Sequence, residues 1–300
     1  MFKGHPKGLL AAALSNMGER FGYYIMNAVL VLFLCSKFGL GEGTAGTIYS
    51  FFYAGIYLLS LVGGIIADRT QNYKGTIKTG LVIMASGYVL LSIPILATSG
   101  NIGWLLPLTC FALFLIAFGN GLFKGNLQAI VGQMYDNFEA EAAKKGPEAL
   151  KAAKDKRDAG FQIFYVFINV GGLIAPFVAP ILRQWWLGTN GMVYNAQLPA
   201  LCHQYQETGA VTEQLTKLAT ESGLTADGNI ATFCGDYLQV FNEGIHYSFI
   251  ASVAAMLISL TIFIATRKRF PTPAKKAAAV SVDYTPEERK AAAKEIKQRM

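Results

Sequence analysis

The sequence has little charge. Asp, Glu, Lys and Arg make up 15% of its 300 residues, whereas a soluble globular domain carries about 25%. The charged residues gather in a few segments, and the long stretches between them contain almost none. This distribution excludes an ordinary soluble domain and is typical of a chain whose outer surface faces lipid.

Histidine is scarce too. The three residues, His5, His203 and His246, have no spacing that suits a metal or a catalytic group. No nucleophile motif appears either, so we expect neither a metal site nor an enzyme. The net charge of +7 could suggest a nucleic acid partner. The basic residues border apolar stretches instead of forming a stripe on a folded domain, which argues against nucleic acid.

Cysteine is equally sparse, with four residues and no metal-ligand spacing. Cys35 and Cys110 lie in apolar stretches, and we expect them to be core residues. Cys202 and Cys234 lie in one polar segment, where a disulfide and two free thiols both remain open.

Apolar sequence is what the chain has in excess, since 53% of its residues are hydrophobic. A membrane-spanning helix needs about 20 mostly apolar residues, and six segments meet that requirement. In chain order they are Leu9–Lys37, Thr44–Ala67, Thr76–Ala97, Trp104–Tyr135, Phe161–Trp185 and Ile245–Thr266. We therefore predict an all-α integral membrane protein with six transmembrane helices in one bundle over residues 1–267.

Two connections and the C-terminal segment stand out by composition. Residues 136–160 form a strongly charged loop, in which a short helix could begin at Pro147. Residues 186–244 form a long polar loop with few basic residues. Residues 268–300 are predicted to be a linker with an amphipathic helix, because Thr285 and Pro286 have the pattern of a helix start.

The basic residues also predict the orientation. With the N-terminus inside, 21 of the 26 Lys and Arg residues fall in inside segments, three fall outside, and Arg20 and Lys124 lie within spans. Basic residues favour the cytoplasmic side of a membrane. We therefore expect a multi-pass protein of the cytoplasmic (inner) membrane, with both termini and residues 136–160 in the cytoplasm and residues 186–244 in the periplasm.

The first span is unusually polar on one side. The polar residues that share this arc of the helix are Asn16, Glu19, Arg20, Tyr23, Tyr24 and Asn27. Such a face cannot point at lipid, so it lines a bundle interior or a wet cavity. The alternative is a buried Glu19–Arg20 pair that only fixes packing. We favour the cavity, because side chains adjacent on a helix point about 100° apart.

Three later spans carry further polar residues at membrane depth. Tyr53 and Tyr57 share a helix face with Tyr49, which is consistent with packing or with a cavity lining. Lys124 has apolar residues on both sides, which favours a cavity over a side chain that reaches the interface. Asn169 could bond a neighbouring helix or a ligand.

The charges at membrane depth do not balance, because Glu19 faces two cations, Arg20 and Lys124. A carboxylate from a substrate or from a missing part of the protein could neutralise the second cation. The imbalance favours anionic or zwitterionic cargo over a neutral sugar. Near the end of the second span, Asp68 and Arg69 follow small residues and have the placement of a cytoplasmic latch, with Asp68 paired to Arg69 or Lys74 or capping a helix.

These motifs together resemble the proton-dependent oligopeptide transporters of the major facilitator superfamily. Glu19–Tyr24 resembles the core of the family's E-x-x-E-R-F-x-Y-Y motif, and Gly64–Arg69 the superfamily's loop signature after helix two. Lys124 with Asn126 resembles the helix-four lysine motif, and Arg157–Gly171 the helix-five signature. The matches occur in order over the first 266 residues.

The resemblance implies the N-terminal bundle of a major facilitator, a 3+3 inverted repeat, that imports di- and tripeptides with protons as the coupling ion and no other cofactor. It implies that the substrate is bound by residues of helices one, two, four and five. They are Arg20, Tyr23, Tyr24, Tyr57, Lys124 and Asn169, and from their helix faces we expect Asn27 and Tyr53 to line the same site. It further implies proton coupling through Glu19 and Lys124, and gating by Asp68 and Arg69.

Several features depart from the family pattern. Asn16 stands where the motif has its first acid, Asn27 where many members have a second Arg, and Gly125 where many have Pro. The family also has two six-helix halves. We therefore expect a truncated chain or one half of a split transporter, which does not transport alone and whose partner is a missing C-terminal half. The alternatives are transport of another small anion, such as nitrate or a carboxylate, and a non-transporting scaffold half.

Overall fold

The computed structural model describes residues 3–98, 100–226 and 228–272, and no strand occurs within these ranges. Six of its helices are long and apolar enough to cross a membrane. They are α1 (Leu9–Phe38), α2 (Glu42–Thr70), α3 (Tyr73–Ser92), α4 (Ile102–Ala143), α5 (Pro147–Thr189) and α8 (Ile230–Thr266). The predicted all-α membrane fold with six spans is confirmed.

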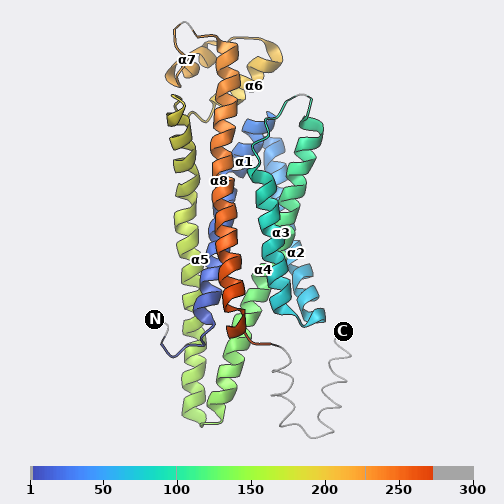
Figure 1. The fold of residues 1–300 in the computed structure, drawn as a ribbon, viewed down its shortest axis with the longest axis vertical. Coiled ribbons are helices and arrows are strands. Elements are labelled where there is room, and N and C mark those ends of the chain that lie inside the picture. Colours follow the sequence, from blue (N-terminus) through green and yellow to red (C-terminus); the bar gives the residue numbers. More distant parts are fainter. Residues whose placement is uncertain (1–2, 99, 227, 273–300) are drawn as a thin grey trace.

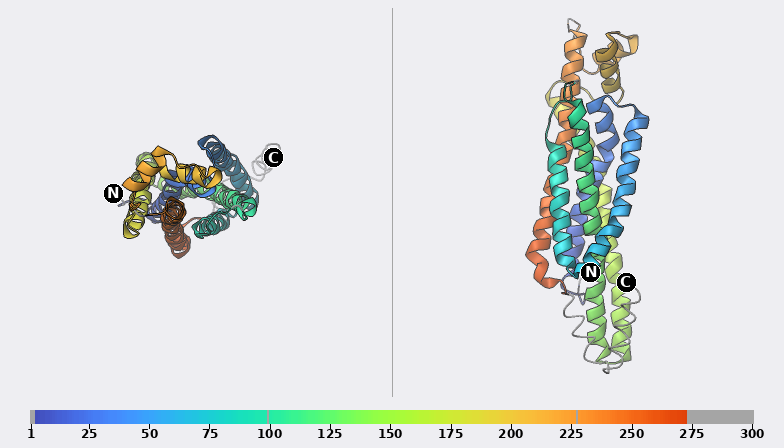
Figure 2. Two further views of the ribbon diagram at one scale, coloured as in Figure 1. Left: turned by 90° about the horizontal axis from the view of Figure 1, so that it is seen from above. Right: turned by 90° about the vertical axis from the view of Figure 1, so that its right-hand side faces the viewer.

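The helices form one elongated bundle in which α1 is the most enclosed (Figures 1 and 2). α1 packs against α5 and α8, α2 and α3 pack against α4, and α3 also packs on α8. In the most apolar 18-residue window of each helix, 61% of the residues of α1 are buried, but 22% in α2 and 17% in α5. α2 and α5 therefore present broad apolar faces to the outside of the bundle.

α4 and α5 extend well beyond the other helices at one end of the bundle, here called the hairpin end (Figure 1). Between them only Lys144–Gly146 is not helical, so the prediction of a loop over residues 136–160 is wrong. Gly146 has a φ of +119°, which lets the chain reverse, and Pro147 then starts α5. Arg157 bridges the hairpin with bonds of 2.8 Å to Asp136 and 3.2 Å to Glu139.

The opposite end, here called the cap end, carries the short helices α6 (Leu198–Thr208) and α7 (Glu213–Glu221) (Figure 1). α8 begins at Ile230, earlier than the predicted Ile245, because Asn229 caps its first turn. Its first turns bury an aromatic row instead of crossing lipid. That row consists of Phe233, Tyr237 and Phe241.

Two other boundaries differ from expectation. α3 ends at Ser92, not at Ala97, because Pro94 has no N–H to continue the helix and the preceding Ile93 is extended. Beyond α8, a single 3₁₀ turn, η1 (Arg267–Arg269), is described. The amphipathic helix predicted near Thr285 lies outside the described residues.

The cysteine expectations are partly overturned. Cys35 is half-buried, but Cys110 is exposed, because its side of α4 faces away from the bundle. Cys202 and Cys234 are fully buried free thiols on α6 and α8. The neighbouring Cys234 thiol, together with burial, raises the pKa of Cys202.

Close backbone contact joins α2 to α4. A Cβ added to Gly63 would collide with the carbonyl of Gly121, and one added to Gly121 would collide with the carbonyl of Leu59. Small residues at such crossings let membrane helices approach closely, where van der Waals contact replaces the hydrophobic effect as the driving force.

We therefore expect Gly63→Ala to lower the free energy of unfolding by about 1–3 kcal/mol, the usual cost of overpacking. Thermal unfolding in detergent would measure it. Gly46→Ala, in the same helix with open space around its Cα, is the control and should be neutral or slightly stabilising. Equal stability of the two variants would contradict this packing.

Candidate functional site

At the centre of the bundle, α1 holds a buried ion pair between adjacent residues. Glu19 is 0% exposed and Arg20 is 6% exposed. Arg20 Nε donates to Glu19 Oε2 at 2.6 Å and an Nη donates to Oε1 at 2.5 Å. The expectation that these neighbours do not face each other is wrong, because the long Arg side chain folds back along the helix and its fork matches the carboxylate.

Residues of α4 and α3 complete the surroundings of this pair. Asn120 is fully buried, and its amide donates to Glu19 Oε1 at 2.7 Å. Tyr88 of α3 is also fully buried. Sequence reasoning assigned a role to neither residue. The sequence could have indicated Asn120, because it precedes Lys124 by one helical turn and therefore lies on the same face of the helix.

The hydroxyl of Tyr88 and the amide oxygen of Asn120 have no hydrogen-bond partner among the described residues. Buried polar groups are normally satisfied. The Tyr88 hydroxyl and the Asn120 amide oxygen therefore keep unused hydrogen-bonding capacity.

Lys124 lies on the open side of this pair and is half-buried. Its Nζ is 5.6 Å from the centre of the Tyr57 ring on α2. The Tyr57 hydroxyl is 3.1 Å from that of Tyr53, which stacks on Tyr49. Within the described part of the chain, no carboxylate lies within 4.0 Å of Lys124. Because Glu19 is occupied by Arg20, Lys124 has no carboxylate partner at this site in the described ranges.

The remaining predicted substrate residues lie around these two groups. Tyr23 supports Arg20, with the guanidinium carbon 4.8 Å from its ring centre, and meets Tyr24 edge to face at 5.4 Å. Tyr24 packs on Gly172 of α5. Asn169, one turn earlier on α5, is exposed. The structure thus brings Glu19, Arg20 and Tyr23 into direct contact and leaves Asn169 on an open face.

The two asparagines of the helix-one stripe differ in burial. Asn16 is 4% exposed, which fits a neutral residue packed inside the bundle. Asn27 is half-buried, and its amide oxygen has no partner in the described ranges.

The two gating candidates lie at the hairpin end of α2. Asp68 accepts a short hydrogen bond from the hydroxyl of Tyr73, the first residue of α3. Arg69 is exposed. Asp68 therefore ties the end of α2 to the start of α3, through a tyrosine that was not anticipated.

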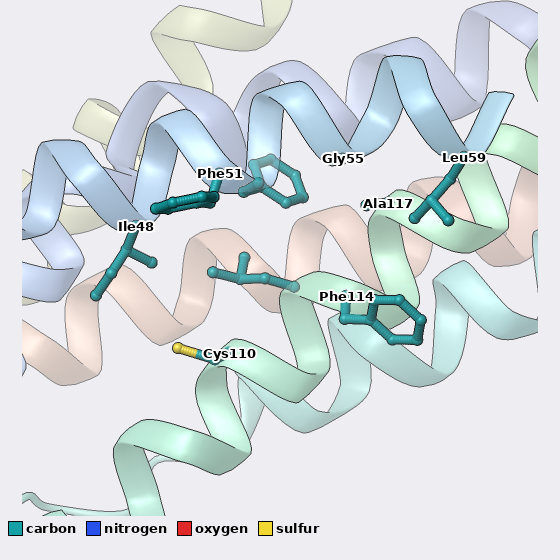
Figure 3. Close-up of a pocket in the computed structure, with 9 residues that line it drawn as sticks. Ile48, Phe51, Gly55, Leu59, Cys110, Phe114 and Ala117 are labelled. Atoms are coloured by element: carbon teal, nitrogen blue, oxygen red, sulfur yellow. The ribbon is translucent and has the colours of Figure 1, made fainter. Parts of the chain in front are cut away.

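An apolar hollow lies on the face of α2 opposite its tyrosines. It has a volume of about 290 Å³ and is lined by apolar side chains of α2 and α4 (Figure 3). Phe51, Phe114 and the exposed Cys110 lie along it. It holds no charged group, so the polar cluster, and not this groove, is the candidate site.

We expect Glu19→Gln to destabilise the chain by about 3–5 kcal/mol, because it leaves the buried Arg20 charge uncompensated. Asn120→Leu should cost about 1.5–3 kcal/mol, the range for a hydrogen bond to a charged group. Chemical unfolding in detergent would measure both. Glu42→Gln, at an exposed position, is the matched control. A Glu19→Gln variant as stable as this control would show that the pair is not formed.

The sequence of this chain is similar to a protein-family model and to known transporters. A model described as the POT family matches residues 74–283. An uncharacterised transporter of Bacillus subtilis, YclF, is 32% identical over 202 residues, which is 66% of this chain and 35% of that protein. A di-/tripeptide transporter of Lactococcus lactis is 34% identical over 190 residues, covering 61% of this chain and 33% of that protein.

The fold is also similar to solved structures of the same family. A crystal structure of a peptide transporter POT in complex with sulfate matches 99% of this chain and 44% of its own chain, with 28% identity and a TM-score of 0.58. The chain thus spans about a third of the length of these relatives and less than half of that structure. The family model covers more than half of this chain, and the chain belongs to the POT family.

Proposed function

We propose that this chain is the first six-helix bundle of a proton-coupled importer of di- and tripeptides. The observation that carries the proposal is the charge arrangement at membrane depth. One carboxylate, Glu19, is held by Arg20 and Asn120, while Lys124 stands on the open side without an acidic partner in the described part of the chain. The carboxylate of a peptide would supply the missing negative charge.

Proton and peptide binding are linked in this proposal through Arg20. When Glu19 is ionised, its two oxygens receive donors from Arg20 and Asn120. A proton on Glu19 removes the charge that holds the guanidinium, and a buried guanidinium then needs another anion. The peptide carboxylate takes the place of the Glu19 charge and is shared by Arg20 and Lys124, so proton and peptide enter together, and Lys124 links the substrate to the charge state of Glu19.

The other predicted residues shape the pocket around this carboxylate. Tyr23 and Tyr24 form the α1 wall, and the bonded hydroxyls of Tyr53 and Tyr57 form the α2 wall. Asn27 and Asn169 supply amides for the peptide backbone. Asp68 and Arg69, at the hairpin end, hold the inward gate.

The proposed transporter needs a second bundle. Exposed apolar side chains continue along both α2 and α5. Among them are Phe51, Leu58, Leu61, Leu173, Phe177 and Ile181. Faces of this size on a membrane protein pack against further helices or lipid. The relatives are far longer than this chain, so we assign the other wall of the cavity to a second six-helix bundle, on the same polypeptide or on another.

We propose the cytoplasmic membrane as the location, with the hairpin end inside. The start of α1 and the end of α8 both lie at the hairpin end (Figure 1). The basic cluster of residues 144–157 lies there as well, as the preference of Lys and Arg for the cytoplasmic side requires. The cap end then faces the periplasm.

Uptake of labelled dipeptide into proteoliposomes tests the proposal. The chain reconstituted with its second bundle should take up peptide when the outside is acidic, and Lys124→Ala should reduce uptake at least about tenfold, the effect of losing one charged partner of a carboxylate. Lys78→Ala removes an exposed lysine at the hairpin end and should leave uptake unchanged. Normal proton-driven uptake by Lys124→Ala would remove the lysine from the mechanism.

Competition separates the substrate classes. Unlabelled di- and tripeptides should compete with the labelled dipeptide, and free nitrate or a small carboxylate should not. Competition by nitrate alone would identify a small-anion transporter. Capture of a six-helix partner with no solute binding would identify a scaffold.

A further inference from the structure

A second buried cluster lies at the cap end of α1, far along the helix from Glu19. Ser36 and Lys37 are 1% and 5% exposed. The Ser36 hydroxyl donates to Asn242 Oδ1 at 3.0 Å, and the Asn242 amide donates to the Ser36 carbonyl at 3.1 Å. His203 Nε2 donates to the same carbonyl at 2.7 Å. α1 therefore ends in polar contacts with α6 and α8.

His246 joins three helices in this cluster and is 3% exposed. Its Nδ1 is 2.7 Å from the carbonyl oxygen of Leu91 at the end of α3. A carbonyl only accepts, so Nδ1 carries a proton and donates. Its Nε2 is 3.2 Å from Lys37 Nζ. With Lys37 charged, Nε2 must therefore be unprotonated and accept from the ammonium.

The groups around His246 offer little to balance another positive charge. The rings of Phe33 and Phe249 meet the imidazole edge to face, at 5.6 Å and 6.0 Å. Over the described ranges, no carboxylate lies within 4.0 Å of Lys37. A second proton would place imidazolium against ammonium, with no carboxylate of the described residues within 4.0 Å of either group.

The other charged or titratable groups nearby are already engaged. Glu243, one turn before His246 on α8, accepts from Trp186 at 3.2 Å and from Gln239 at 3.0 Å. Arg183 of α5 packs on Gly244, on another side of α8, with its guanidinium 4.1 Å from the Tyr194 ring. His203 bonds the backbone and not Lys37.

A hollow of about 210 Å³ with a mixed polar and apolar lining borders His246. It is lined by Gln239, Asn242 and Glu243 of α8 and by residues 94–96, which follow α3. The polar groups on its α8 side can hydrogen-bond water in a space of this size. Such water is the source from which, in the proposal below, the imidazole receives a proton.

We propose that His246 is a proton-binding site at the cap end, whose protonation breaks the Lys37 contact that links the end of α1, through the imidazole, to α3. Neutral His246 ties Lys37 of α1 to the Leu91 carbonyl of α3. When water in the cavity delivers a proton to Nε2, the lone pair that accepts from Lys37 is lost and the two cations repel. The proposal rests on this cluster alone and holds whether or not the chain carries peptides.

Two measurements on the chain in lipid nanodiscs test the proposal. The first is nitrogen NMR of the protein labelled with ¹⁵N-histidine, in which the three histidines can be assigned with single His→Gln variants. At neutral pH, His246 should show a protonated Nδ1 and an unprotonated Nε2, and acidification should add the second proton. A neutral-pH spectrum with Nε2 protonated would overturn the assignment.

The second measurement is amide hydrogen exchange of residues 33–38, corrected for the intrinsic effect of pH. Acidification should speed exchange roughly tenfold in the wild-type chain, because local opening sets the rate. It should not do so in His246→Gln, which cannot gain the proton. His203→Gln is the matched control and should keep the acid response. An acid response that survives in His246→Gln would refute the proposal.

A third variant covers the case in which His246→Gln does not fold. Lys37→Met removes the neighbouring cation and retains the imidazole. Its His246 should protonate at higher pH than in the wild-type chain, and exchange of residues 33–38 should no longer change at that pH. Unchanged titration of His246 in Lys37→Met would show that the two groups are not coupled.

Discussion

The centre of the bundle depends on one interaction, the ion pair that supplies a partner for the buried charge of Arg20. Arg20 finds this partner in its own neighbour, with bonds of 2.5 and 2.6 Å to Glu19. Asn120 then fixes the free side of that carboxylate from α4. Desolvating two charges is expensive, and removing either one leaves the other unsatisfied in a medium of low dielectric. The pair accordingly ties α1 to α4 at the middle of the bundle.

The same ion pair explains why Lys124 is different. Glu19 is taken by Arg20, and the Lys124 ammonium lies 5.6 Å from the Tyr57 ring. The lysine is half-exposed. Asn16 is neutral, and it stands at the position where the E-x-x-E-R-F-x-Y-Y motif has its first acid. It therefore adds no second carboxylate to the cluster. The cluster of Glu19, Arg20 and Lys124 therefore has one carboxylate for two cations.

Much of this was predictable from the sequence. The six apolar segments and the polar arc around Arg20 follow from periodicity and from the cost of burying charge. The prediction of a loop over residues 136–160 was wrong. Many charged residues indicate that a segment is exposed to solvent, but a segment rich in Ala and charged residues also forms a helix readily. The Glu19–Arg20 contact was misjudged because the angle between Cβ positions ignores the reach of the Arg side chain. Tyr88 and His246 could not have been found, since their roles depend on which distant helix packs beside them.

The central claim is that Glu19 gives up Arg20 only when it takes a proton, and that a peptide carboxylate then replaces it. The most direct test is calorimetric titration of dipeptide into the assembled two-bundle protein in buffers of different ionisation enthalpy, which counts protons taken up on binding. The account predicts uptake of about one proton per peptide below neutral pH, by linkage between the two sites, and its loss in Glu19→Gln. Peptide binding without proton uptake in the wild-type protein would contradict it.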